Sequence, residues 1–154
     1  MINSTFIKKM GDVLTKAIPI SIIPVVYFLL GYKQIILCAL IYGVGMLVTE
    51  VLKGVFDAPR PRETVDDHVI YVHGYSHNDG ESLCSSHAMS AALPAYFALF
   101  FIKPWWVCIP FILLAWLCAW TRVKVKAHWP LDVIISNIIA FNLNLLVAYI
   151  FSIL

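Results

Sequence analysis

The sequence has few charged residues for a chain of its length. Asp, Glu, Lys and Arg make up 13% of the 154 residues, and the formal net charge is only +2. Soluble domains are roughly one-quarter charged, and here hydrophobic residues reach 61%. The composition excludes a soluble globular domain and predicts an integral membrane protein, with the lipid bilayer as its surroundings and no nucleic-acid partner.

The sequence also lacks cysteine motifs, repeats and linkers. It contains no CxxC pair and no Cys/His spacing of the zinc type, so we expect neither a metal site nor a cofactor. The charges of residues 1–16 are spread out instead of preceding an apolar core, so we expect no cleavable signal peptide. Without repeats or linkers, residues 1–154 are predicted to form a single membrane-embedded domain. The four cysteines are Cys38, Cys84, Cys108 and Cys118.

Long apolar runs are the main feature of the sequence. A membrane crossing needs about 20 residues, and the runs predict an all-α integral membrane bundle of about five transmembrane helices. In residues 1–16, apolar side chains at helical spacing alternate with lysines, which predicts an N-terminal amphipathic helix in the interface. The first run is short and is expected to borrow length from this helix. The polar stretch 57–84 is predicted to be an active-site loop or lid. The runs cover 17–31, 34–55, 85–102, 105–122 and 130–154.

The polar residues near the ends of these runs share one side of the membrane. In a five-helix bundle, the end of the second run, the start of the third, the end of the fourth and the start of the fifth all lie on the same face. Chemically capable side chains occur at these four places, so we expect them to converge. They are Lys53, Arg60, Ser85, Ser86, His87, Arg122, His128 and Asp132.

The cations of this group indicate a phosphate site. Unpaired cations at a membrane edge are costly, and a phosphate would satisfy Lys53, Arg60 and Arg122 together. Arginine binds phosphate oxygens in bidentate fashion, and lysine adds a point charge. The start of the third helix would contribute free backbone N–H groups and a positive helix end, with the hydroxyls of Ser85 and Ser86 beside it.

Two histidines complete the predicted site. His128 and Asp132 are four residues apart and share a helix face if the fifth helix has begun by then. A carboxylate on one ring nitrogen leaves the other nitrogen free to attack. His87 has no carboxylate close in sequence and is free to protonate a leaving oxygen. The pattern predicts phosphoryl transfer through a phosphohistidine, followed by attack of water.

Three segments resemble the motifs of a known family. Lys53 to Pro61 fits KxxxxxxRP, residues 84–87 (CSSH) resemble PSGH, and residues 121–132 resemble SRxxxxxHxxxD. Together they resemble the type 2 phosphatidic acid phosphatase family, which shares its site with vanadium haloperoxidases. The departures are Cys84 for proline, Ser86 for glycine and Thr121 for serine.

The resemblance implies a role for each matching residue. His128 would be the nucleophile, Asp132 its partner and His87 the general acid. The phosphate would be bound by the remaining motif residues, and no metal is implied. These phosphate-binding residues would be Lys53, Arg60, Ser85, the Ser86 backbone and Arg122.

The expected function is therefore that of a compact bacterial membrane lipid phosphatase. Candidate substrates are phosphatidic acid, phosphatidylglycerol phosphate, an isoprenyl diphosphate or a lipid A phosphate. Two alternatives are a lipid-to-lipid phosphotransferase with the same site and a non-catalytic lipid-binding protein. The distribution of Lys and Arg places the site on the cytoplasmic side. The resemblance more often implies a site facing the periplasm or exterior of an inner membrane, and we expect the latter.

Overall fold

Five long helices make up the structure, a computed structural model that describes residues 4–56, 60–61 and 82–153. Of the predicted loop at 57–84, only residues 60–61 and 82–84 are among those described. The described residues contain no strand, and the predicted all-α class is confirmed. The helices are α1 (Ser4–Leu30), α2 (Tyr32–Val55), α3 (Ser86–Phe101), α4 (Ile109–Lys124), which follows the 3-10 turn η2 (Trp105–Cys108), and α5 (Pro130–Ile153).

Four segments are long and apolar enough to cross a membrane, namely α1, α2, Trp105–Lys124 and α5. They expose many large apolar side chains, such as Phe28, Leu47 and Tyr149, as helices in contact with lipid tails do. The protein is therefore an integral membrane protein, as the composition predicts.

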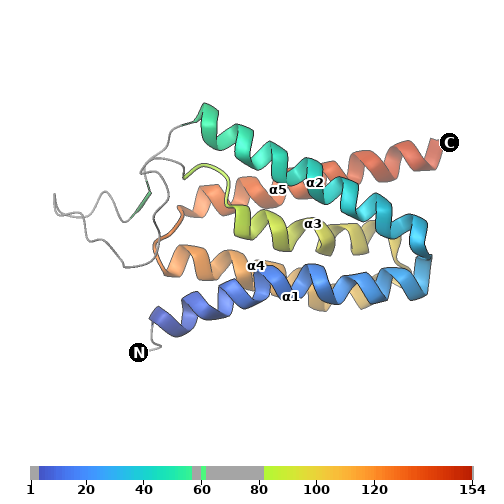
Figure 1. The fold of residues 1–154 in the computed structure, drawn as a ribbon, viewed down its shortest axis with the longest axis horizontal. Helices are drawn as coiled ribbons and strands as arrows, with labels where there is room; N and C mark the ends of the chain where they lie inside the picture. The colour runs from blue at the N-terminus through green and yellow to red at the C-terminus, as the bar shows by residue number, and fades with distance from the viewer. Residues whose placement is uncertain (1–3, 57–59, 62–81, 154) are drawn as a thin grey trace.

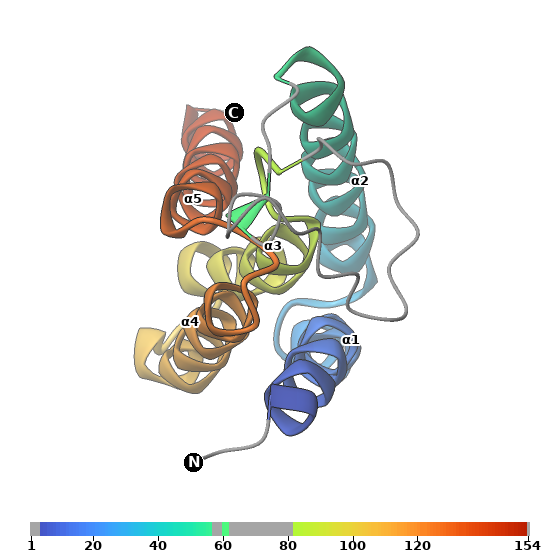
Figure 2. The same ribbon diagram turned by 90° about the vertical axis from the view of Figure 1, so that its left-hand side faces the viewer.

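Helix α3 forms the centre of the bundle. Figure 2 shows it surrounded by α1, α2, α4 and α5, and every residue from Ala88 to Ala98 is buried. It has only 16 residues, fewer than the roughly 20 of a typical crossing. Five alanines lie within the buried stretch, and small side chains let neighbouring helices approach closely. A helix that is apolar on every face needs such surroundings.

The predicted interfacial helix at 1–16 and the predicted first crossing at 17–31 are not separated in the structure. The described residues of both form the continuous helix α1. Its buried residues lie four or seven positions apart on both sides of this junction, so one stripe packs against the bundle along the whole helix. These residues are Ile7, Gly11, Ile18, Ile22 and Val26. The first run does borrow length from the residues before it, as expected.

The helix ends that carry the predicted site lie together. In Figure 1 the start of α1, the end of α2, the start of α3, the end of α4 and the start of α5 all lie at the left end of the bundle. The first turn of α3 is set back from the ends of its neighbours in this view. The bundle thus surrounds the positive end of its central helix.

Candidate active site

The start of α3 is held by two serines. Ser85 is the N-cap: its Oγ accepts a hydrogen bond from the backbone N–H of Ala88 at 3.3 Å. Its own N–H donates to Oγ of Ser136 on α5 at 2.8 Å. Since the first N–H groups of a helix have no carbonyl partner within it, those of Ser86 and His87 make this end a site for an anion.

His128 is oriented from its Nδ1 side. Nδ1 lies 3.0 Å from the backbone carbonyl oxygen of Ser82 and 3.6 Å from Oδ2 of Asp132. Because a carbonyl oxygen only accepts, Nδ1 carries the hydrogen and Nε2 keeps its lone pair. Asp132 is itself held by Oγ of Ser82 at 2.6 Å and by the N–H of Trp129 at 2.8 Å. The arrangement leaves Nε2 without a part in these contacts.

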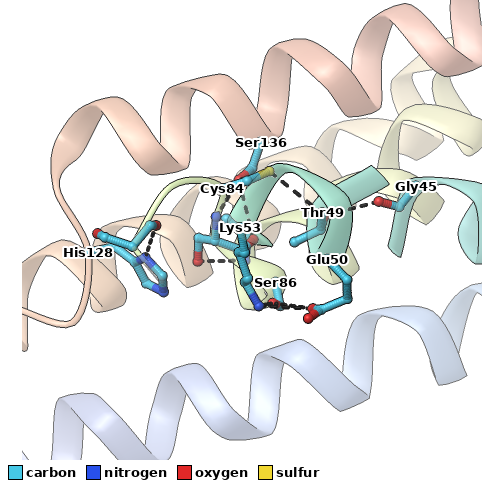
Figure 3. Close-up of polar contacts among 11 residues, drawn as sticks. Gly45, Thr49, Glu50, Lys53, Cys84, Ser86, His128 and Ser136 are labelled. Carbon is cyan, nitrogen blue, oxygen red and sulfur yellow. Dashed lines mark hydrogen bonds and ion pairs between the residues drawn. The ribbon is translucent and has the colours of Figure 1, made fainter. Parts of the chain in front are cut away.

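Lys53 reaches the start of α3 from the end of α2. Its Nζ is 2.9 Å from Oε1 of Glu50 and also donates to Oγ of Ser86. Figure 3 shows these three side chains joined by the dashed lines. The Lys53 side chain is 12% exposed, whereas Glu50 is 59% exposed. The ammonium group is thus fixed beside the helix end, and Ser86, which replaces the glycine of the motif, helps to fix it.

Arg122 is buried, with only 1% of its surface exposed. Its Nη2 donates to the backbone carbonyl of Lys8 at 3.1 Å and lies 3.0 Å from Oδ1 of Asp12. Its Nε donates to Oγ1 of Thr121 at 3.3 Å. The same Oδ1 of Asp12 lies 3.4 Å from Nε2 of His87. The Asp12 carboxylate of α1 therefore lies beside both His87 of α3 and Arg122 of α4.

Arg60 is 9% exposed. Its short described segment, 60–61, lies at the same end of the bundle as the start of α3 (Figure 1). The predicted site residues thus share this end. Among the described residues, no three His, Cys, Asp or Glu side chains gather in a way that could hold a metal ion.

Cys84 shows how this chain departs from the motif. Its φ angle is +70°, in the left-handed region, whereas proline is restricted to about −65°. A proline could not adopt this backbone conformation. The Cys84 thiol is fully buried, 3.3 Å from Oγ of Ser136 and 3.8 Å from Oγ1 of Thr49. Side-chain contacts to α2 and α5 therefore hold the chain in place before α3, where the family motif has a rigid proline ring (Figure 3).

Three site residues were missed by the interpretation of the sequence. Asp12 was assigned to an interfacial helix, and its spacing from the motifs gives no sign of contact. Ser82 acts partly through its backbone carbonyl, which no side-chain pattern reveals. Ser136 was expected only to face other helices; its position four residues after Asp132 is the one available signal, because it places both on one helix face.

Comparisons with known proteins agree with the motifs. The sequence profile of the PAP2 superfamily matches residues 34–153, which include every predicted site residue. A crystal structure of a transmembrane PAP2-type phosphatidylglycerolphosphate phosphatase from Bacillus subtilis is similar in fold. It has a TM-score of 0.68 and 20% identity, over 97% of this chain and 76% of that one. No curated protein matches the sequence. Because the profile covers most of the chain, this protein belongs to the PAP2 superfamily.

Proposed function

We propose that the protein is a metal-independent membrane lipid phosphatase that acts through a phosphohistidine. One observation carries the proposal: His128 is held through Nδ1, with Nε2 left to attack, at the bundle end where α3 presents its N-terminus. Lys53 and Arg122 lie at that end with their side chains already held by neighbours. Preorganised positive groups of this kind stabilise the charge of a transferring phosphoryl group.

In the first step, the lone pair of His128 Nε2 forms a bond to phosphorus while the bond from phosphorus to the lipid oxygen breaks. His87, in the first turn of α3, gives its proton to the departing oxygen. Asp132 and the Ser82 carbonyl stabilise the positive charge that develops on the His128 ring. The products are a lipid alcohol, or a lipid monophosphate from a diphosphate, and a phosphohistidine.

In the second step, water attacks phosphorus and the bond from phosphorus to Nε2 breaks. The proton of the water passes to His87, which returns to its starting form, and inorganic phosphate leaves. Throughout, Lys53, Arg122 and the N–H groups that open α3 neutralise the phosphoryl oxygens, with Ser85 capping that helix and Arg60 as a further cation. No cofactor is needed for this sequence of steps.

The position of the site favours a lipid as the substrate. The catalytic end of the bundle lies where the apolar helices end, so a phosphate there can be bound while acyl or isoprenyl tails stay in the bilayer. The substrate class we propose is a lipid phosphate or diphosphate: phosphatidic acid, phosphatidylglycerol phosphate, an isoprenyl diphosphate or a lipid A phosphate.

The test is phosphate release from these four lipids in mixed micelles, by wild type and by His128→Ala, with and without a chelator. We expect wild type to release phosphate from at least one lipid, with the chelator making no difference. His128→Ala should lose activity by several orders of magnitude, because the change removes the attacking nitrogen. Equal release by both proteins would contradict the mechanism, and loss of activity with the chelator would contradict metal independence.

A further inference from the structure

A carboxylate from α1 lies between the two groups that flank the phosphate site. Oδ1 of Asp12 is 3.4 Å from Nε2 of His87 and 3.0 Å from Nη2 of Arg122. Asp12 lies before residues 34–153, the part of the chain that matches the superfamily profile. Its place in the site is thus a property of this chain's first helix and not of the three motifs.

The backbone of α1 is shaped to bring this carboxylate close. A side-chain carbon at Gly11 would lie 2.1 Å from both Nη2 of Arg122 and Oγ1 of Thr121. Only glycine permits that approach. The carbonyls of Lys8 and Gly11 also accept from Arg122 and Cys118. Asp12 is therefore set against the site by a close helix–helix contact instead of reaching it from a mobile chain end.

The ion pair between Asp12 and Arg122 does not fully explain the position of the Asp12 carboxylate. Oδ1 is buried, yet it has no hydrogen bond of acceptable geometry in spite of its two near neighbours. A buried carboxylate oxygen without a donor is costly. The ring nitrogen of His87 is close enough to supply one after a small rotation. The Asp12 and His87 side chains remain 38% and 30% exposed, so substrate can reach the pair.

We propose that Asp12 is a positioning residue for the general acid His87. The proposal rests on the phosphatase mechanism proposed above. The carboxylate accepts from Nε2–H, which favours the imidazolium form of His87 and holds Nε2 facing the site; the ring becomes neutral when it gives up this proton. When the leaving oxygen enters beside Nε2, it takes this proton as the P–O bond breaks. When water later returns a proton to Nε2, Asp12 stabilises the resulting imidazolium.

The leaving group distinguishes this role from a merely structural one. An alkoxide needs a proton as it departs, whereas p-nitrophenolate departs without one, so only the former depends on the general acid. We therefore compare octyl phosphate and p-nitrophenyl phosphate as substrates of wild type and Asp12→Asn, a change that keeps the shape of the side chain. For octyl phosphate, kcat/KM, which reports on the steps up to formation of the phosphohistidine, should fall at least about tenfold, part of the roughly hundredfold or greater contribution of a positioned general acid. For p-nitrophenyl phosphate, kcat/KM should change little.

A double-mutant cycle shows whether Asp12 acts through His87. In the His87→Ala background, Asp12→Asn should no longer lower kcat/KM for octyl phosphate. Glu50→Gln is the matched control, since it removes the carboxylate beside Lys53. Its effect should be the same for both substrates, because its partner binds phosphate and donates no proton to the leaving oxygen.

The outcomes separate this proposal from the phosphatase mechanism. If wild type hydrolyses neither octyl phosphate nor any lipid phosphate, the proposed function fails. If wild type is active and Asp12→Asn lowers kcat/KM equally for both substrates, in both backgrounds, then Asp12 serves only Arg122 and the positioning role is wrong. A selective loss on octyl phosphate that disappears without His87 supports it.

Discussion

At the scale of single residues, Ser136 connects the catalytic helix α5 to the start of α3. Its Oγ accepts from the N–H of Ser85 at 2.8 Å and donates to the carbonyl of Asp132, also at 2.8 Å. The Ser85 N–H and the Asp132 carbonyl are buried and out of reach of water, so the Ser136 hydroxyl supplies the hydrogen bonds that they need. One hydroxyl thus fixes the position of the helix N-terminus relative to the residues that hold His128.

We therefore expect Ser136→Ala to destabilise the protein by about 1–3 kcal/mol, the cost of leaving the buried Ser85 N–H without an acceptor. KM for the lipid phosphate should also rise, because the anion site at the start of α3 loses its support. Thermal unfolding in detergent and steady-state kinetics measure the two effects. Ser152→Ala is the control: Ser152 is exposed near the opposite end of α5, and its Oγ donates to the carbonyl of Tyr149. Equal stability of the two variants would contradict this role.

The charged residues of the candidate site could be singled out from the sequence, because a charged side chain at a membrane edge is costly unless it has a function. Lys53, Arg122 and Asp132 stand out for that reason, and the spacing of His128 from Asp132 adds direction. Ser82 could not be predicted, since its contacts depend on how the chain enters α3. Its hydroxyl holds Asp132 and its carbonyl holds the His128 ring.

At the scale of elements, the contact between α1 and α4 decides where Arg122 lies. The close approach occurs at Gly11, where the added carbon of any other residue would overlap Arg122 and Thr121. The Arg122 guanidinium fills the remaining space and bonds the carbonyl of Lys8. The packing of these two helices therefore also fixes the position of Arg122, the proposed phosphate ligand.

Gly11→Ala should consequently cost about 1–3 kcal/mol through overpacking, and it should lower activity because the guanidinium must move. Gly43→Ala is a matched control in another helix, since a side-chain carbon there meets nothing within 4 Å. That variant should be neutral or slightly more stable, because alanine favours a helix over glycine by about 1 kcal/mol. Thermal unfolding and phosphate release test both variants. Unchanged stability and activity in Gly11→Ala would show that the helices are not in close contact there.

The apolar runs predicted the existence of the helices and the boundaries of most of them, but not the start of α1 or the central position of α3. α2 and α5 begin and end within about two residues of the predicted runs, because turn residues flank both. α1 extends further than predicted, since its apolar stripe passes through charged residues. The central place of α3 was not predicted, although its alanines and its apolar character on every face were a usable signal.

At the scale of the whole molecule, the direction of the five helices explains why distant motifs meet. Each crossing reverses the direction of the chain, so the end of one helix and the start of the next lie on the same face. Figure 1 shows the ends of α2 and α4 beside the starts of α3 and α5. This part of the architecture followed from counting crossings alone. The arrangement of helices around α3 did not, because it depends on side-chain packing that periodicity does not encode.

The same topology makes the sidedness of the site testable. We propose that the site faces the periplasm or exterior, as the family resemblance suggests, although Lys and Arg are concentrated at this end. Lys124 lies at the catalytic end and Lys33 at the opposite end, and both are exposed. With the half-buried Cys38 replaced by alanine, a membrane-impermeant maleimide applied to intact bacterial cells should label Lys124→Cys and not Lys33→Cys. The reverse pattern would place the site in the cytoplasm.

The central claim is that phosphate passes through His128. Its most direct test is to mix the protein briefly with a radiolabelled lipid phosphate that it hydrolyses, denature it, and measure phosphate bound to the protein. The mechanism predicts a phosphoprotein that is stable in alkali and labile in acid, as phosphohistidine is, with the label on His128. His128→Asn should carry no label. Turnover by wild type with no such intermediate under rapid quenching, or equal labelling of His128→Asn, would contradict the account.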